Sequence, residues 1–463
     1  MKLKKLFVQN FRCFKELEIE FHPKLTVIVA DNGAGKTTIL DAIAVGFGRL
    51  LTKLPKISGI TSKDSDLRIT TDEKRAPFLL YSVQAEHSIS KELIEWSAIR
   101  KRDSSPKTTS VISALINREK ASIPGFKQID EYANELIDAE NDGEPYLMPV
   151  IAYYGTNRAL LEEVQRRRNF RKEFTRFDAL SGSLEPNARF KIAFEWFNSM
   201  EDLERRRKEE KRDFNYRLPE LETIRLAIEN MLAGFHNPRT EIGPLRFVID
   251  RTLADGSIKT FRVTQLSDGY RVMLGLVMDL ARRMEQANPH LVKDGMAIAN
   301  PLDLPAIVLI DEIDLHLHPR WQQRVIGDLQ RTFPGAQFIV TTHSPQVLTT
   351  VDSKCIRVLH DEMDSDTSKI NSTILNVSRQ TKGVASSDVL AEVMNIDPIP
   401  DEVEAHNLSQ YHALIQQNQH DQQHGSALRE ALDNHFGTNH PVMLECDRLI
   451  RLQIFKRKLP KLD

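Results

Sequence analysis

The fold is decided by residues 25–38, Leu25-Thr-Val-Ile-Val-Ala-Asp-Asn-Gly-Ala-Gly-Lys-Thr-Thr38. This stretch predicts a buried strand, a glycine-rich turn and a helix, because Ile39, Ile43 and Phe47 continue it at helical spacing. Backbone N–H groups of such a turn, at the N-terminus of a helix, hold phosphate groups. The pattern therefore predicts an ATP site, with nucleotide contacts at Asn32, Gly33, Ala34, Gly35, Lys36, Thr37 and Thr38.

Two side chains of this turn have specific expected tasks. Lys36 is expected to reach the β- and γ-phosphates, and the hydroxyl of Thr37 to ligate Mg²⁺. The strict pattern has glycine where Ala30 stands, and alanine there would cost roughly 1–2 kcal/mol if the position needed a positive φ. Gly33 and Gly35 remain at the turn itself, so we still expect it to form a phosphate-binding loop.

A second apolar strand, residues 306–310, runs directly into Asp311-Glu312. Acidic residues at the end of a buried strand complete a nucleotide site, with Asp311 holding the metal and Glu312 activating the attacking water. A positioned general base of this kind contributes about 10²–10⁴ in rate. The two strands together therefore predict an enzyme that converts ATP and water to ADP and phosphate.

The composition is that of a soluble globular protein and suggests two to four domains for 463 residues. The formal net charge of −2 excludes a globally basic nucleic-acid binder, although local basic patches remain possible. Three widely spaced cysteines, the lack of a long apolar run and the lack of a signal peptide favour a cytoplasmic protein that does not enter a membrane.

The order of apolar runs and turns predicts an α/β fold with an added helical insertion and a helical C-terminal domain. Strands are expected at 3–8, 17–21, 25–30, 78–85, 93–99, 148–154, 306–310 and 337–341, a hairpin over 247–263, and helices at 37–50, 159–175, 186–213, 218–233 and 269–284. The predicted domains are an N-terminal ATPase lobe (1–158, with a mobile insertion near 100–125), a helical insertion (159–240), a C-terminal ATPase lobe (241–360) and a helical partner-binding region (361–463). The acidic, serine-containing segment 361–372 marks the last boundary.

Between the two phosphate clusters lies Leu266-Ser267-Asp268-Gly269-Tyr270-Arg271, at the start of an amphipathic helix. The ordered set of phosphate loop, L-S-x-G element, acidic strand end and the later strand-end His343 resembles ABC-type ATPases. In that family the signature element of one protomer closes over ATP held by another, so the resemblance implies head-to-tail dimers. Asp268 and Tyr270 depart from the family's Gly and Gln, whereas Ser267 and Gly269, expected to face the γ-phosphate, are kept.

Three further stretches resemble the RecF/SMC and OLD-type branch of these ATPases. They are Asn10-Phe-Arg-Cys-Phe14, Asp311-Glu-Ile-Asp-Leu-His-Leu-His-Pro319 and Thr342-His-Ser-Pro345. The resemblance implies that Arg12 contacts the base or a phosphate, that Asp314 acts across the dimer interface and that His343 senses the γ-phosphate. His316 and His318 are expected to position their loop rather than to bind a metal.

Two side-chain roles have alternative assignments. The residue that links the γ-phosphate to the rest of the domain is either Asn157, after the strand 148–154, or Gln84, near the end of the strand 78–85. The basic runs at 166–176 and 205–208 could contact nucleic acid, but acidic residues are interleaved with them, and such runs are more often solvated helix faces.

The stretch 149–158, Pro-Val-Ile-Ala-Tyr-Tyr-Gly-Thr-Asn-Arg, and the helical C-terminal region are similar to the Septu-type ATPases of bacterial antiphage systems, which also occur beside retrons. This resemblance implies an ATPase that regulates a separate HNH-type nuclease, and we expect no nuclease activity in this chain alone. The alternative is a RecF-like repair ATPase that clamps DNA ends or gaps. A transporter subunit fits less well, because its signature would lie nearer the phosphate loop.

Overall fold

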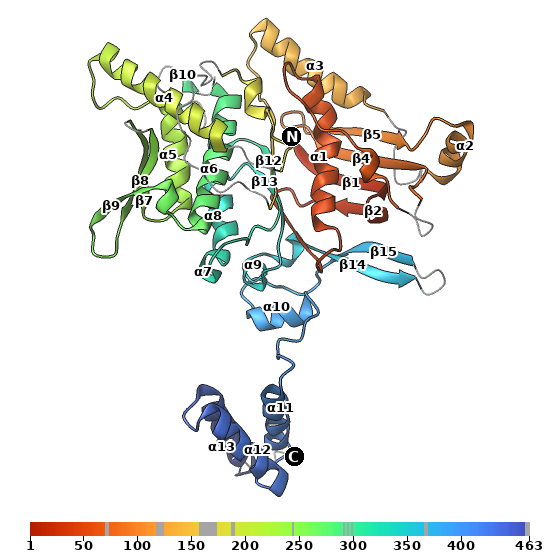
Figure 1. The fold of residues 1–463 in the computed structure, drawn as a ribbon, viewed down its shortest axis with the longest axis vertical. Coiled ribbons are helices and arrows are strands. Elements are labelled where there is room, and N and C mark those ends of the chain that lie inside the picture. Colours follow the sequence, from red (N-terminus) through yellow and green to blue (C-terminus); the bar gives the residue numbers. More distant parts are fainter. Residues whose placement is uncertain are drawn as a thin grey trace. The chain divides into compact units, whose positions relative to one another are not determined.

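The computed structural model describes residues 1–69, 74–116, 125–156, 174–186, 190–242, 245–289, 292–293, 296–297, 300–364 and 369–458 (Figure 1). The chain forms two compact units, Met1–Val389 and Leu390–Asp463, which are described separately. None of the helices in the described ranges has both the length and the apolar character needed to cross a membrane.

A six-stranded sheet lies at the centre of the first unit. Its order is β15 (Lys369–Asn376), β14 (Ile356–Asp364), β3 (Leu25–Val29), β13 (Gln337–Thr341), β12 (Ala306–Ile310) and β6 (Val150–Tyr154). All neighbouring strands are parallel except β15, which forms an antiparallel hairpin with β14. Strands β3, β6, β12 and β13 are buried along their whole length, as expected for parallel strands covered on both faces. Their carboxyl ends therefore meet at one edge.

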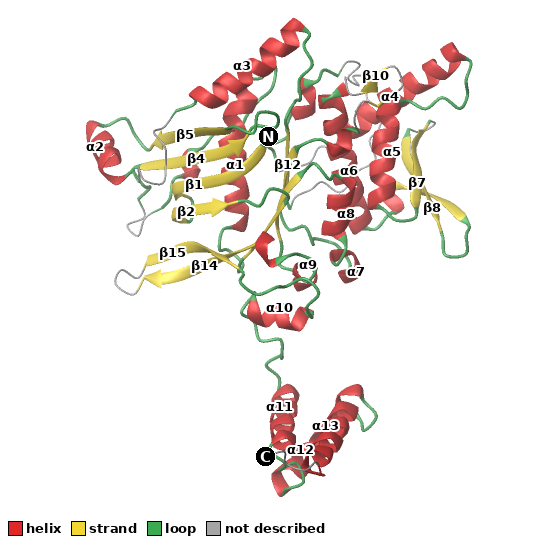
Figure 2. Ribbon diagram, turned by 180° about the vertical axis from the view of Figure 1, so that it is seen from behind, coloured by secondary structure: helices red, strands yellow, loops and turns green. Residues whose placement is uncertain are grey.

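An antiparallel sheet forms the second layer, with the order β2 (Phe14–Glu20), β1 (Lys2–Phe11), β4 (Phe78–Glu86) and β5 (Leu93–Lys101). Helix α1 (Lys36–Lys53) contacts strands of both sheets, and Ile39, Ile43 and Phe47 on it are fully buried. Figure 2 shows α1 beside this sheet, with α2 (Pro106–Leu115) and α3 (Lys127–Asp142) next to it. The long helix that follows the phosphate loop is thus held in place by packing on several sides.

Helices on the other side of the central sheet form a second lobe, seen in green in Figure 1. It contains α4 (Phe190–Lys211), α5 (Pro219–Met231), α6 (Asp268–Ala287), α8 (Val325–Thr332) and the sheet β7 (Phe235–Glu241), β8 (Arg246–Thr252) and β9 (Ile258–Arg262). Helix α6 is buried over most of its length and packs on α5 and β6. Helix α6 thereby attaches this lobe to the edge of the central sheet that strand β6 forms.

The remaining short elements lie in the first unit, except that the last one extends past its end at Val389. They are η1 (Asp64–Asp66), η2 (Phe177–Leu180), η3 (Val263–Gln265), β10 (Val292–Lys293), β11 (Met296–Ala297), η5 (Pro301–Asp303), α7 (Pro319–Gln322), α9 (Pro345–Leu348), η6 (Ser353–Cys355) and α10 (Ser386–Glu392).

The polar segment 361–372, which was expected to mark the last domain boundary, lies in the central sheet, and the chain divides after Val389 instead. Strands β14 and β15 occupy most of this segment and form one edge of the central sheet. An edge hairpin can carry acidic and serine side chains because only its backbone must pair, which is why composition misled the prediction. The expected insertion near 100–125 contains helix α2 over 106–115, and residues 117–124 lie outside the described ranges.

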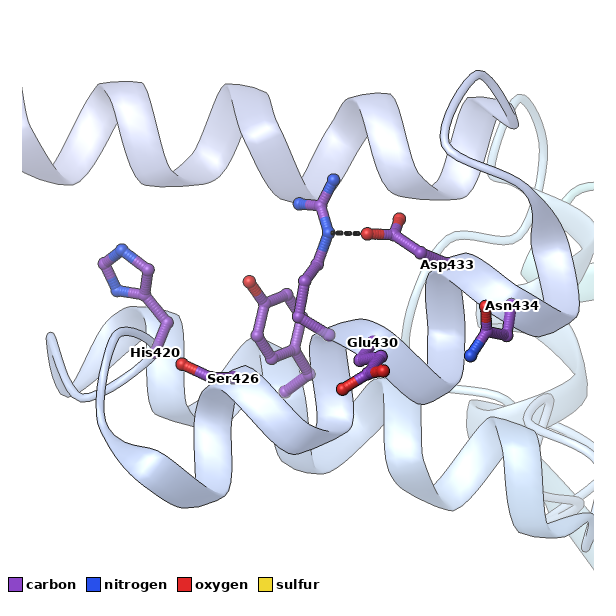
Figure 3. Close-up of a pocket in the computed structure, with 7 residues that line it drawn as sticks. His420, Ser426, Glu430, Asp433 and Asn434 are labelled. Atoms are coloured by element: carbon purple, nitrogen blue, oxygen red, sulfur yellow. Dashed lines mark hydrogen bonds and ion pairs between the residues drawn. The ribbon is translucent and has the colours of Figure 1, made fainter.

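In its described residues, beyond the end of α10, the second unit contains the helices α11 (Val403–Gln416), α12 (Gln423–Phe436) and α13 (Pro441–Lys458). Its small core is built from Tyr411, Ile415, Leu428, Leu432, Met443 and Cys446. Arg429 pairs with Asp433 at 2.8 Å (Figure 3). It also pairs with Asp447 at 2.5 Å, which ties α12 to α13. Arg429 and Asp433, together with His420 and Ser426, line an open cavity of about 330 Å³.

Candidate active site

The glycine-rich turn has the backbone that a phosphate-binding loop requires. Gly33 and Gly35 adopt left-handed conformations with φ of 83° and 106°, and α1 begins directly after them. A side chain at position 35 would also collide with neighbours, because a Cβ there would lie 2.6 Å from Phe14 and 2.7 Å from Cys13. Gly35 is therefore required by both conformation and space. Asn32, Ala34 and Thr38 complete the turn at the N-terminus of the helix.

Ala30 causes no strain, because it is not among the described residues with positive φ. Its carbonyl oxygen accepts a hydrogen bond of 2.8 Å from Nζ of Lys36, and the carbonyl of Asp31 accepts another of 2.9 Å. Burial lowers the pKa of Lys36, while the nearby charges of Asp311 and Glu312 act in the opposite direction. The lysine is thus held beside the turn in a position to donate to an anion.

The end of β12, the end of β13 and the start of α1 meet around Asp311. One carboxylate oxygen accepts a hydrogen bond of 2.7 Å from the hydroxyl of Thr37, and the other accepts one of 2.6 Å from Thr341 at the end of β13. The Thr341 hydroxyl in turn accepts the backbone N–H of Glu312 at 2.7 Å. Lys36, Thr37, Asp311, Glu312 and Thr341 are called the phosphate cluster below. Thr341 was not predicted from the sequence, although its polar side chain at the end of an apolar strand was a usable signal.

The phosphate cluster fits a magnesium ion. Mg²⁺ prefers oxygen ligands and keeps several waters, and here Thr37 and Asp311 bring a hydroxyl and a carboxylate oxygen within 2.7 Å of each other. Thr37 and Asp311 would hold such an ion, and it would neutralise charge that develops during phosphoryl transfer. Glu312 is only partly buried and has a left-handed φ of 46°, a conformation that is uncommon outside functional turns.

The loop after β12 is tied to the end of β13. The hydroxyl of Thr342 donates to Asp314 at 2.5 Å, and the hydroxyl of Ser344 donates to Gln322 at 2.8 Å. His343 lies between these two anchored residues and is partly exposed. Gln322 also donates to the carbonyl of Leu317 at 2.9 Å, which holds the loop against helix α7. The predicted sensor His343 is therefore carried by a firmly held segment next to the phosphate cluster.

The signature element forms a second surface, which is called the signature cluster and consists of Ser267, Gly269, Tyr270, His316 and Trp321. A Cβ at Gly269 would lie 2.6 Å from the carbonyl oxygen of His316, so glycine is required by packing within the chain. Tyr270, where the family has Gln, packs its ring on Trp321 with centroids 4.4 Å apart. Ser267 precedes α6 without a capping bond from its side chain and lines a cavity of about 350 Å³.

Comparison with known proteins agrees with these two clusters. Residues 5–232 match the family model described as an AAA domain. The Retron Ec83 probable ATPase of Escherichia coli is 28% identical over 99% of this chain and 87% of that protein. The Retron Vc95 probable ATPase of Vibrio cholerae serotype O1 biovar El Tor is 26% identical over 91% of this chain and 85% of that protein.

Shorter stretches match further proteins of the same kind. Septu protein PtuA of Bacillus mycoides (strain KBAB4) is 39% identical over 18% of this chain and 10% of that protein, and other short stretches match RecF proteins and an OLD nuclease. The chain is an ABC-type ATPase of the RecF/SMC/OLD-like branch. The predicted resemblance to this branch and to retron and Septu ATPases is confirmed, and the matches support ATPase activity.

In this ABC-type ATPase, Tyr154 at the end of β6 connects the two clusters. Its carbonyl oxygen accepts the N–H of Asp311 at 2.8 Å, and its hydroxyl donates to Asp279 of helix α6 at 3.0 Å. Asp279 is fully buried and also bonded to Arg282 at 2.7 Å and Arg283 at 2.6 Å. Burial alone would raise the pKa of Asp279, but the two arginines outweigh it and lower that pKa to about 2. This link was not predicted, because 125 residues separate its ends.

The structure places Arg12 among carboxylates. Its guanidinium pairs with Asp41 of α1 and, at 2.9 Å, with Asp66. Burial opposes the charge, but the hydrogen bonds to these two carboxylates raise the pKa of Arg12. Asp41 also accepts a hydrogen bond of 2.9 Å from Tyr153. Arg12 is half-exposed in this network, and its contact with a base or a phosphate stays a prediction.

The two candidates for the γ-phosphate link differ in their placement. Gln84 lies inside β4, not at a strand end, and its side chain donates to Glu95 of β5 at 3.0 Å. Its strand belongs to the antiparallel sheet, so this position does not suit the role. Asn157 and the basic run from 166 to 172 lie outside the described ranges. Strand β6, which precedes Asn157, pairs with β12 in the central sheet.

Proposed function

We propose that this ATPase binds and hydrolyses ATP between two copies of the chain and thereby regulates a separate nuclease in bacterial antiphage defence. The observation that carries this proposal is the 2.7 Å contact between Thr37 at the start of α1 and Asp311 at the end of β12, which pairs two oxygen ligands suited to a Mg²⁺–ATP site. The similarity to a retron ATPase over almost the whole chain, and to a Septu protein over part of it, supports the assignment to defence.

Each side chain has a proposed task. The loop amides from Asn32 to Thr38 and the ammonium of Lys36 hold the phosphates, while Thr37 and Asp311 hold Mg²⁺. The carboxylate of Glu312 accepts a proton from the attacking water. As it does so, the water oxygen bonds to the γ-phosphorus, and the bond between the γ-phosphorus and the bridging oxygen of the β-phosphate breaks. His343 donates a hydrogen bond to the γ-phosphate.

The signature cluster is proposed to serve the ATP of a second copy. The hydroxyl of Ser267 and the N-terminus of α6 present donors at the mouth of a cavity, where a γ-phosphate from another chain would fit. Asp314, tied to Thr342, is proposed to act across the same interface. The helical unit after Val389 is proposed to dock the partner, an HNH-type nuclease on a separate chain.

The deciding experiment is an affinity purification of the tagged protein expressed with its native gene neighbours, for the wild type and Glu312→Gln. We expect a nuclease to co-purify and its activity to change with ATP and with the variant. A lone dimer that binds DNA ends only with ATP would reject this function and establish the RecF-like alternative. Loss of phage resistance when the neighbouring gene is deleted is the matching result in cells.

A further inference from the structure

The hairpin tip between α4 and α5 is unusually basic for this chain. Residues 205–217 contain seven Lys or Arg and three Asp or Glu, a local net charge of +4 in a protein whose formal net charge is −2. Helix α4 is packed up to Glu204, with Ala193 and Phe197 fully buried, while residues 205–207 and 209–215 are exposed. Figures 1 and 2 both show this end of α4 at the outer edge of its lobe.

Some of these Lys and Arg side chains form ion pairs with carboxylates, but others do not. Arg205 pairs with Asp202 at 3.0 Å, Arg207 with Glu210 at 3.4 Å, and Lys208 with Glu204 at 3.3 Å. Within the described ranges, by contrast, Arg206 and Arg212 have no carboxylate partner. The ammonium of Lys211 lies 4.1 Å from the centre of the Tyr216 ring.

Two features of the tip oppose stability. Phe214 is 90% exposed, although burying such a ring would contribute about 1.5–3 kcal/mol. Arg212 has a left-handed φ of 51° at the end of α4, where the N–H of Arg212 bonds to the carbonyl of Glu209 and that of Asp213 to the carbonyl of Lys208. This is the helix ending that glycine normally serves, and another residue there costs roughly 1–2 kcal/mol.

An aromatic ring presented beside unpaired cations suits one class of ligand especially well. Single-stranded nucleic acid offers phosphates to the cations and base faces to the ring, and proteins bind it without sequence readout by this combination. A double-stranded helix would hide its base faces from Phe214. We propose that the α4–α5 tip is a docking surface for single-stranded DNA or RNA, with Phe214 stacking on a base and Arg206, Lys211 and Arg212 contacting phosphates.

The test is a titration of the full-length protein with a labelled oligothymidine and, separately, with inorganic polyphosphate, without ATP. Phe214→Ala should weaken oligothymidine binding about 5- to 100-fold, the value of one base stack. It should leave polyphosphate binding unchanged, since that polymer has no bases. The matched control is Phe455→Ala, which removes an aromatic ring that is 60% exposed on α13 and should change neither titration.

A second pair of variants separates binding from folding. Arg212→Gly relieves the left-handed strain, so it should raise the melting temperature while lowering oligothymidine affinity and the slope of log affinity against log salt by about 0.7 per lost phosphate contact. Lys56→Gly removes an exposed cation with a similar φ of 60° elsewhere, and it should stabilise the protein without changing binding.

The results have clear consequences. Equal loss of oligothymidine and polyphosphate binding in Phe214→Ala, or unchanged oligothymidine binding in both tip variants, would overturn the proposal. An acidic protein that is captured only when the tip is intact, together with unchanged oligothymidine binding, would also overturn it in favour of a protein partner. Because no ATP is present, failure here leaves the proposed ATPase function untouched.

Discussion

The phosphate cluster and the signature cluster differ in how far their polar groups find hydrogen-bond partners within one copy of the chain. In the phosphate cluster, Thr37, Asp311 and Thr341 bond to one another within 2.7 Å. In the signature cluster, the backbone is tightly packed around Gly269, but the hydroxyl of Ser267 makes no capping bond and lines a cavity of about 350 Å³. The phosphate cluster, whose polar groups bond to one another, is called the finished half below, and the signature cluster, whose serine lines a cavity, is called the open half. A site shared between two copies requires both halves on each chain.

The largest expected effect comes from removing the proposed base in the finished half. Glu312→Gln keeps the shape and the hydrogen bond from its N–H to Thr341, so ATP binding should persist while turnover falls by about 10²–10⁴. Phosphate release and nucleotide affinity measured on the same preparation check this. The control is Glu131→Gln, the same chemical change at an exposed position of helix α3, and this variant should behave as wild type. Turnover within about threefold of wild type for Glu312→Gln would assign the base elsewhere.

Mixing two inactive variants tests the open half directly. Lys36→Ala disables the phosphate cluster, and Ser267→Arg fills the cavity of the signature cluster, so each alone should hydrolyse little ATP. If the site is shared, mixed dimers contain one intact site, and an equimolar mixture should recover roughly a quarter of wild-type turnover. A mixture with no more activity than its components would show that each chain works alone.

Particular residues show what the sequence could and could not reveal about the two clusters. The strands over 25–30, 306–310 and 337–341 are confirmed, because short apolar runs that end in polar or turn-forming residues are typical of buried strands. The segment 361–372 was misjudged, because an edge hairpin tolerates polar side chains. Thr341 and Tyr154 were missed, because their importance depends on neighbours distant in sequence and brought close only by strand order.

The helix behind the signature cluster should make stability depend on pH. Glu285 on α6 is fully buried, and this burial, together with the nearby carboxylate of Glu220, raises its pKa from 4.5 to about 8. Between these values the folded chain holds a proton that the unfolded chain has lost. Stability should therefore fall as pH rises through this range, by at most about 1.4 kcal/mol per pH unit from this group.

The variant Glu285→Gln carries no titrating group and should flatten that pH dependence. Its melting temperature should exceed that of the wild type by more at pH 8 than at pH 5.5. The matched control is Glu131→Gln, because that carboxylate is exposed and its removal should shift both values alike. Parallel pH curves for the wild type and Glu285→Gln would mean that Glu285 is ionised in the folded chain.

The smallest expected effect concerns the connection between the clusters, and it is the sharpest test of whether they act together. Tyr154→Phe removes one hydroxyl, and Asp279 keeps both arginines, so the free energy of unfolding should fall by only about 1 kcal/mol. Tyr146→Phe, which removes a hydroxyl bonded to Glu140 at 3.0 Å, is the matched control. If the bond to Asp279 transmits the state of the nucleotide from β6 to α6, Tyr154→Phe alone should lower turnover several-fold while leaving the KM for ATP unchanged. Equal turnover in the two variants would reduce Tyr154 to a packing role and leave the two clusters coupled only through ATP itself.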